Sequence, residues 1–162
     1  MTQIARILAA TLLIASASSL AGCGSRYVKG TTVAYSAEKQ ELADLVERYR
    51  RAVESRDTDS LRKMASLNYY ENGSTTTKAE DDYDFNGLQK VLADLKNQVK
   101  AVKYSISIKD IHVLGETARV DYEYKSQYLI AVGEQDRWAT HGDKNRLTFR
   151  REEGEWRILA GM

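Results

Sequence analysis

The fold is decided by residues 101–130, AVKYSISIKDIHVLGETARVDYEYKSQYLI, in which apolar and polar side chains alternate along two runs separated at Gly115. Alternation with a period of two residues predicts half-buried strands. Strands with one apolar face are typical of an antiparallel sheet that is covered on one side. The expected inward-facing residues are Val102, Tyr104, Ile106 and Ile108 in the first run, and Ala118, Val120, Tyr122, Tyr124, Tyr128 and Ile130 in the second.

Two further strands are predicted after this pair. One spans residues 137–151, with a bulge expected at Gly142, and a short one spans residues 156–160 after the turn signal Glu153-Gly154. If residues 132–136 connect a hairpin, Glu123 is expected opposite Arg146 on the outer face of the sheet.

Three helices are predicted before the sheet. Apolar residues at helical spacing indicate one helix over residues 37–56 with Ser36 as N-cap, a short second helix starting at Asp57 or Thr58, and a third after a cap at Asp84 or Asn86. Helices followed by an antiparallel meander predict an α+β fold, in which three N-terminal helices pack in a curved antiparallel sheet.

The chain resembles the nuclear transport factor 2-like (SnoaL-like) superfamily over residues 37–162. The resemblance rests on the order of the elements and on three segments, AVESRDTDSLRKM (52–64), ETARVDYEY (116–124) and KNRLTFRREEGEWRI (144–158). It implies a cone, in which the bent sheet wraps the helices and leaves a pocket at the wide end. A cystatin-like sheet with one long helix is the alternative, and the three separate apolar stripes argue against it.

The N-terminal sequence predicts where the protein is located in the cell. An apolar run of 14 residues (7–20) is too short to span a bilayer and is typical of a signal peptide. Leu20-Ala21-Gly22-Cys23 is similar to the lipobox of bacterial lipoproteins, and the alternative is a plain secretory signal with a coincidental cysteine. The resemblance implies cleavage between Gly22 and Cys23 and acylation of Cys23, which anchors the protein to a membrane.

Three regions follow from this interpretation: a signal peptide (1–22), a lipidated tether (23–36) and the folded domain (37–162). By the sorting rule of lipoproteins, Gly24 favours the outer membrane of the cell envelope. Residues 24–36 show no helical period, although Val28, Val33 and Tyr35 offer an alternative in which this segment docks as an extended strand.

A candidate ligand pocket is formed by inward-facing polar residues of the helices and the sheet: Tyr49, Tyr122, Tyr124, Tyr128, His141 and Asn145. Tyrosine combines an apolar ring with a hydroxyl donor, which suits a small apolar or aromatic ligand, and core packing is the alternative for these tyrosines. His141 and Asp143 are weak candidates for a catalytic base and its charge partner, because His141-Gly142-Asp143-Lys144 is also typical of a solvated strand bend.

The superfamily contains isomerases, cyclases and dehydratases as well as members that only bind or assemble, so the fold does not decide the function. No catalytic residue is carried over, and a non-catalytic module for ligand binding or protein assembly is expected, with an isomerase- or cyclase-type enzyme as the alternative. The outer sheet face, with Arg146 and Arg150, is expected to receive a second subunit or an envelope protein. With 24 basic and 23 acidic residues no nucleic-acid partner is expected, nor is a cofactor or metal, since the acidic run 80–84 suits helix capping.

Overall fold

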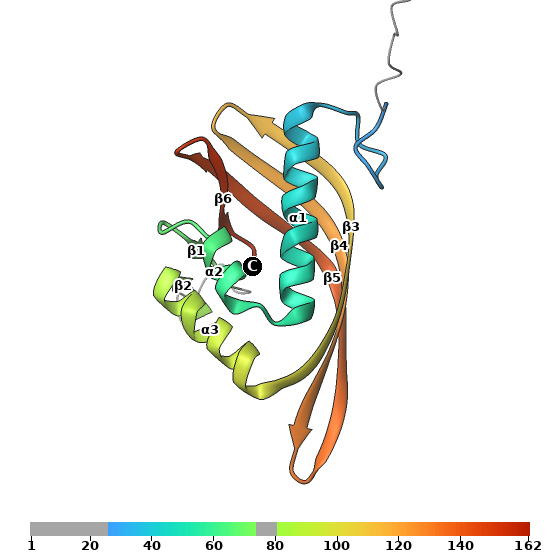
Figure 1. The fold of residues 1–162 in the computed structure, drawn as a ribbon, viewed down its shortest axis with the longest axis vertical. Helices are drawn as coiled ribbons and strands as arrows, with labels where there is room; N and C mark the ends of the chain where they lie inside the picture. The colour runs from blue at the N-terminus through green and yellow to red at the C-terminus, as the bar shows by residue number, and fades with distance from the viewer. Residues whose placement is uncertain (1–25, 74–80) are drawn as a thin grey trace, which may run out of the picture.

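The computed structural model describes residues 26–73 and 81–162, and it shows a long sheet that curves around helices (Figure 1). In chain order the elements are α1 (Ala37–Ser55), α2 (Thr58–Met64), β1 (Tyr70–Glu71), β2 (Tyr83–Asp84), α3 (Phe85–Gln98), β3 (Val99–Leu114), β4 (Thr117–Val132), β5 (Gln135–Glu152) and β6 (Glu155–Ala160). The predicted α+β fold of three N-terminal helices and a curved antiparallel sheet is confirmed. The predicted signal peptide and lipobox lie outside the described residues.

Each helix begins at a polar side chain that the sequence indicated. The Ser36 hydroxyl accepts a hydrogen bond from the Lys39 amide (3.2 Å), and the Asp57 carboxylate accepts one from the Ser60 amide (3.0 Å). Asp84 accepts two, from the amides of residues 86 (2.9 Å) and 87 (3.0 Å). These side chains satisfy amides that have no partner within the helix.

The main sheet has the strand order β3-β4-β5-β6, and all neighbours are antiparallel. The predicted bulge at Gly142 is wrong, because β4 and β5 pair without interruption and Gly142 lies opposite Lys125. A side chain at Gly142 would place its Cβ 3.1 Å from the Tyr124 carbonyl oxygen, so close backbone packing accounts for this glycine. The register shifts lie instead in β3, at 99–101 and 108–110, and between β5 and β6 at 148–149.

The predicted pairing of Glu123 with Arg146 is also wrong. The β4–β5 turn is only two residues long, because Val132 pairs with Gln135, so Arg146 lies opposite Asp121 and their side chains approach to 2.5 Å. Glu123 instead forms an ion pair with Lys109 at 2.9 Å. The pairing differs from the predicted one by two residues, which leaves every side chain on its predicted face of the sheet.

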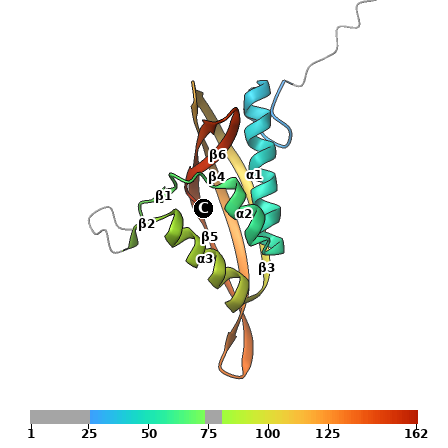
Figure 2. The same cartoon turned by 60° about the vertical axis from the view of Figure 1, so that its left-hand side comes forward.

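The hydrophobic core lies between the helices and the inner face of the sheet. Its most deeply buried side chains come from α1, α2, α3 and all four long strands: Leu42, Val46, Leu61, Leu88, Ile111, Val120, Tyr122, Leu147, Phe149 and Ile158. The β4–β5 hairpin extends past α3, beyond the end of the core (Figures 1 and 2).

Side chains of α1 and of its C-cap Arg56 bind the edge of β3 that faces away from β4, where the described residues form no further strand. Arg50 donates a hydrogen bond to the Tyr104 carbonyl oxygen (3.0 Å), and Glu54 accepts one from the Tyr104 amide (3.3 Å). Arg56 donates to the carbonyl oxygen of Val99. Backbone groups that an edge strand leaves unpaired are therefore satisfied by the helix in the middle and at the start of β3.

Residues 27–34 form a small hairpin that packs on the domain. Tyr27 and Ala34 form an isolated antiparallel bridge, and the Val28 amide donates to the Val33 carbonyl oxygen at 2.9 Å. Val28 and Val33 are 1% and 7% exposed and belong to the core. Within the described residues, the packed part of the chain therefore begins near Arg26 and not at Ala37, and the segment docks as a hairpin rather than as an extended strand.

Candidate functional site

An apolar cavity of about 470 Å³ lies between α3, the C-terminal half of α1 and the inner face of β4 and β5. Most of its wall is aliphatic, from Val53, Leu61, Leu88, Val91, Leu92, Leu95, Val99, Ile130 and Met162. Polar side chains reach it from the helices and from the sheet: Tyr49, Asp94, Gln98, Tyr128 and His141. A cavity with an aliphatic wall and a few polar groups is the usual form of a small-molecule site.

Helical and strand periodicity bring these residues together. Tyr49 and Val53 lie one turn apart on the buried stripe of α1, so both face the sheet. On α3, Leu88 and Leu92 are buried, whereas Val91 on the same stripe is 45% exposed, because this part of the stripe faces the cavity. The alternation of β4 places Tyr128 on the same face as Tyr122, Tyr124 and Ser126.

A cluster of tyrosines adjoins the cavity at Tyr49. The rings of Tyr49 and Tyr104 meet edge to face with their centroids 6.1 Å apart, and Tyr124 lies 5.9 Å from Tyr104 and 6.3 Å from Tyr122. These separations are typical of favourable aromatic pairs. The rings therefore form one continuous aromatic wall from α1 across β3 to β4.

The tyrosine hydroxyls of this cluster stay protonated. Burial raises the pKa of Tyr49 well above its ordinary value, and the neighbouring Tyr104 and Tyr122 raise it further. Burial likewise raises the pKa of Tyr104 to about 12 and also raises the pKa values of Tyr122 and Tyr128. At neutral pH these groups are uncharged hydrogen-bond donors.

Two hydroxyls of β4 are enclosed and form no hydrogen bond of good geometry among the described residues, although Tyr104 and Asn145 lie close to the first and Tyr128 to the second. They are the Tyr122 hydroxyl and the Ser126 hydroxyl, and each residue is only 1% exposed. Ser126 lies directly opposite His141, which lines the cavity. Neither of the two residues that carry these hydroxyls lines the cavity, so the hydroxyls that a ligand there would meet are those of Tyr49 and Tyr128.

The structure brings together some of the predicted pocket residues and separates others. Tyr49, Tyr128 and His141 line the cavity, whereas Tyr122 is buried and does not line it. The remaining two residues, Tyr124 and Asn145, also lie outside it. Tyr124 lines a groove that also reaches the outer face of the sheet, and Asn145 donates to the Gly161 carbonyl oxygen at 3.2 Å.

Asp143 does not act as the charge partner of His141. Its carboxylate accepts a hydrogen bond from the amide of Lys144 (2.7 Å), and within the described residues nothing joins it to His141. Both residues are exposed. Two residues that are adjacent on one strand face are nearly 7 Å apart, which leaves the two side chains beside one another in solvent.

The α3 side of the cavity was missed by sequence reasoning. Asp94, Gln98 and the aliphatic residues of α3 form nearly half of the wall. The one available signal was the third apolar stripe, which was assigned to core packing because periodicity alone does not tell whether a stripe meets side chains or a cavity.

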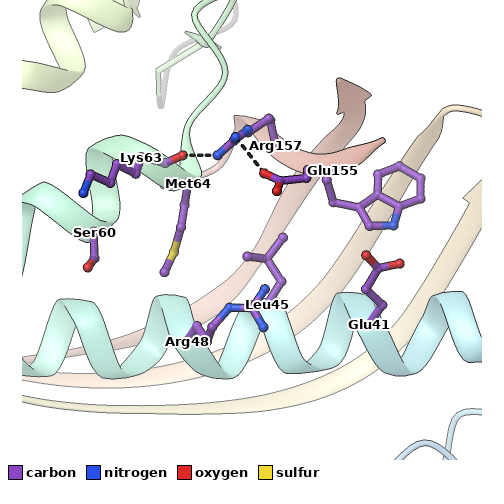
Figure 3. Close-up of a pocket in the computed structure, with 9 residues that line it drawn as sticks. Glu41, Leu45, Arg48, Ser60, Lys63, Met64, Glu155 and Arg157 are labelled. Atoms are coloured by element: carbon purple, nitrogen blue, oxygen red, sulfur yellow. Dashed lines mark hydrogen bonds and ion pairs between the residues drawn. The ribbon is translucent and has the colours of Figure 1, made fainter. Parts of the chain in front are cut away.

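A second, more polar cleft of about 360 Å³ lies between α1, α2 and β6 (Figure 3). Its charged residues are largely bonded within the protein. Arg157 forms an ion pair with Glu155 (2.8 Å) and donates to the Lys63 carbonyl oxygen (2.5 Å), while Glu41 lies 3.5 Å from Arg151. The indole nitrogen of Trp156 is enclosed there without a hydrogen-bond partner among the described residues.

No group of three or more metal-binding side chains converges within residues 26–73 and 81–162. Asp84 of the acidic run acts as the cap of α3. In the same described ranges, no helix combines the length and the apolar character that crossing a bilayer requires.

Comparison with protein families identifies the domain. Residues 38–160 match the family described as calcium/calmodulin dependent protein kinase II association domain. The chain belongs to this association domain family. The match covers the helices and the whole main sheet, so it includes every element that lines the cavity.

Solved structures that are similar to this chain have the same fold. The association domain of calcium/calmodulin dependent protein kinase II from C. elegans is 15% identical with a TM-score of 0.58, over 77% of this chain and 93% of that one. A nuclear transport factor 2-like protein of unknown function from Pseudomonas putida KT2440 is 14% identical with a TM-score of 0.61, over 77% and 84%.

An enzyme has the fold as well. A hexachlorocyclohexane dehydrochlorinase is 10% identical with a TM-score of 0.63, over 77% of this chain and 82% of that one. At these identities the likeness extends to the fold alone. No curated protein sequence matches the chain.

Proposed function

We propose that this protein is a lipid-anchored component of the cell envelope whose association-type domain holds a small apolar or aromatic ligand without transforming it. The observation that carries the proposal is the cavity between α3 and the sheet, which has an aliphatic wall and polar groups at Tyr49, Tyr128 and His141. Its volume of about 470 Å³ lies within the ordinary range for ligand pockets.

The chemistry of the wall favours an uncharged ligand with one polar group. The hydroxyls of Tyr49 and Tyr128 on the cavity wall are protonated at neutral pH, because burial raises the pKa of both side chains. Neutral hydroxyls bond well to a carbonyl or hydroxyl group, whereas they do not offset the desolvation of a carboxylate. A single aromatic hydroxy or keto compound fits these conditions.

Three matched probes test the proposal: naphthalene, 1-naphthol and 1-naphthoate, titrated into the full-length protein purified in detergent. We expect 1-naphthol to bind more tightly than naphthalene, and 1-naphthoate to bind weakest. Tyr49→Phe should remove most of the preference for 1-naphthol while the affinity for naphthalene is kept. Tyr35→Phe, an exposed tyrosine outside the cavity, is the control. Absence of binding by all three probes would refute the ligand site.

The anchor is supported by the sequence Leu20-Ala21-Gly22-Cys23, which places the single cysteine of the chain at the position that lipoproteins acylate. Gly24 favours the outer membrane. Two or more acyl chains hold a protein stably on a bilayer, so the anchor needs no basic surface. We expect the wild-type protein to carry a lipid-sized mass increment and to sediment with membranes, and Cys23→Ser to lose both. A Cys23→Ser protein that still carries lipid would contradict the anchor.

Protein assembly is the second candidate function. It is favoured by the membership of the chain in a family named for association and by Trp138, which is 46% exposed on the outer sheet face. A homodimer or a complex with an envelope protein through that face is compatible with a ligand in the cavity, because the two sites lie on opposite faces of β4 and β5.

An isomerase- or cyclase-type reaction is the remaining alternative, and His141 on the cavity wall is the observation that favours it. The identity of the molecule that copurifies with the protein separates the alternatives. If His141 were a catalytic base, His141→Gln would exchange the bound species for its precursor. For a binding module, the variant changes the amount bound and not the compound, which mass spectrometry of the extracted ligand reports.

A further inference from the structure

The hairpin at the start of the domain leaves very little chain between the proposed anchor and the folded protein. Arg26 directly precedes the Tyr27–Ala34 bridge, and the hairpin is held to the core by Val28 and Val33. The Lys29 amide also donates to the Gln40 side chain of α1 at 3.0 Å. Only Gly24 and Ser25 separate Cys23 from Arg26.

This spacing limits how far the domain can lie from the lipid. Three residue steps span at most about 10 Å even when fully extended. The headgroup layer of one leaflet is itself about 5–8 Å thick. With acyl chains on Cys23 in the bilayer, the end of the domain that carries the hairpin must lie at or just above the headgroups.

The surface at this end suits a lipid interface. Tyr27 and Tyr35 are each 47% exposed at the hairpin, and Leu114, the last residue of β3, is 82% exposed. Figures 1 and 2 show that the hairpin, the start of α1 and the β3–β4 turn lie at one end of the molecule. Tyrosine is enriched at membrane interfaces, because its ring enters the apolar boundary while its hydroxyl stays hydrated.

The charges of the hairpin also favour contact with an anionic lipid surface. Arg26 and Lys29 are exposed, and residues 24–36 contain no acidic side chain. A basic side chain near an anionic leaflet contributes about 1 kcal/mol. The two cations add to the attraction of the exposed apolar side chains without being needed for the anchor.

We propose that this end of the domain, defined by Tyr27, Tyr35 and Leu114, lies in the headgroup layer of the membrane and fixes the orientation of the domain. The proposal rests on the anchor at Cys23 put forward above. In this arrangement the domain contacts the lipid directly and does not stand off the lipid on a flexible tether.

The orientation places the cavity on the far side from the lipid. α1 runs from the hairpin end towards α3 (Figure 1), and Tyr49 is 12 residues along it from Ala37. At 1.5 Å per residue, Tyr49 lies about 18 Å further from the membrane than the start of the helix, measured along the helix axis. The ligand would therefore enter from the aqueous phase and not from the bilayer.

Site-specific quenching in bilayers tests the orientation with the full-length, lipidated protein. Single cysteines are introduced as Tyr27→Cys or Leu114→Cys at the proposed contact, and as Val91→Cys near the cavity as a matched exposed control. Each is labelled with a fluorophore and placed in nanodiscs whose lipids carry a nitroxide at the headgroup. We expect several-fold stronger quenching at positions 27 and 114 than at position 91.

Two contrary results are distinguishable. Equal quenching at the three positions, with the protein still bound to the nanodiscs, would overturn the orientation and leave the anchor standing. Loss of the protein from the nanodiscs, together with a mass that lacks lipid, would overturn both. Melting curves of the three cysteine variants show whether each is folded. In a separate variant, residues 27, 35 and 114 are all changed to serine and a label is attached at position 39. This triple change should reduce quenching of the label without releasing the protein from the nanodiscs.

Discussion

Gly161 occupies a position in which no other residue fits. Its φ of +95° favours glycine, and a Cβ there would lie 1.9 Å from the Arg146 carbonyl oxygen. We expect Gly161→Ala to lower the free energy of unfolding by about 3 kcal/mol or more, because backbone must move in addition to the strain at positive φ. Gly115→Ala, with φ of +56° and open space around it, should cost only about 1–2 kcal/mol. Equal losses in chemical denaturation would contradict this account.

Trp156 belongs to the core, at 5% exposure, and Arg151 lies over its ring at 4.4 Å. Trp156→Ala should destabilise the fold by about 3–5 kcal/mol, as large-to-small changes of buried aromatic residues do. Trp138→Ala removes the same side chain from a site that is 46% exposed, so its effect should be clearly smaller. Matched denaturation curves of the two variants give the difference, and a melting curve of Trp156→Ala that equals the wild type would place this ring outside the core.

At the scale of elements, α1 carries an ion-pair network that responds to acid. Hydrogen bonds from Arg50 and from Arg51 lower the pKa of Glu47 to about 2, although burial opposes them. The pKa of Glu47 is lower in the folded than in the unfolded state, so its stabilising contribution is complete above about pH 4.5 and is lost as pH falls towards 2. Glu47 is 44% exposed on its side chain, so this contribution is modest.

Glu47→Gln should therefore flatten the dependence of stability on pH between about 5 and 2, while stability at the acidic end stays close to that of the wild type. Thermal unfolding at a series of pH values measures this. Glu134→Gln, in the β4–β5 turn, is the control and should keep the wild-type slope. An unchanged slope in Glu47→Gln would show that the network does not act through this carboxylate.

Local signals were sufficient for the three helices and the strands of the main sheet, but not for β1, β2 and the hairpin at 27–34, nor for the strand pairing. Ser36, Asp57 and Asp84 were predictable as caps because capping depends on residues two or three positions away. The register of β4 against β5 depended on the place of the turn, and the Gly133-Glu134 turn was not distinguishable from its neighbours in the sequence. Of the sheet residues predicted for the candidate site, Tyr128 and His141 line the cavity, and Tyr122, Tyr124 and Asn145 do not. The α3 wall required knowledge of how α3 crosses the sheet.

At the scale of the whole molecule, the proposed association through the outer sheet face can be tested at Trp138. Trp138 lies there with Lys103 5.0 Å from its ring, and the β4–β5 hairpin that carries it extends past the core. If copies of the domain associate through this face, Trp138→Glu should shift the mass measured by light scattering to that of a single chain. Leu67→Glu, which changes a more exposed apolar residue in the turn between α2 and β1, should leave the mass unchanged. A multimer that persists in Trp138→Glu would assign association to a different surface.

The side chains that bind the edge of β3 also affect how neighbouring molecules interact at high concentration. Proteins anchored to one leaflet reach high local concentrations, and a bare strand edge would then template sheet growth from one molecule to the next. Arg50, Glu54 and Arg56 occupy the backbone groups through which such growth would begin. If the protein is anchored as proposed, these contacts would make edge-to-edge growth of the sheet between neighbouring molecules less favourable at Val99 and Tyr104.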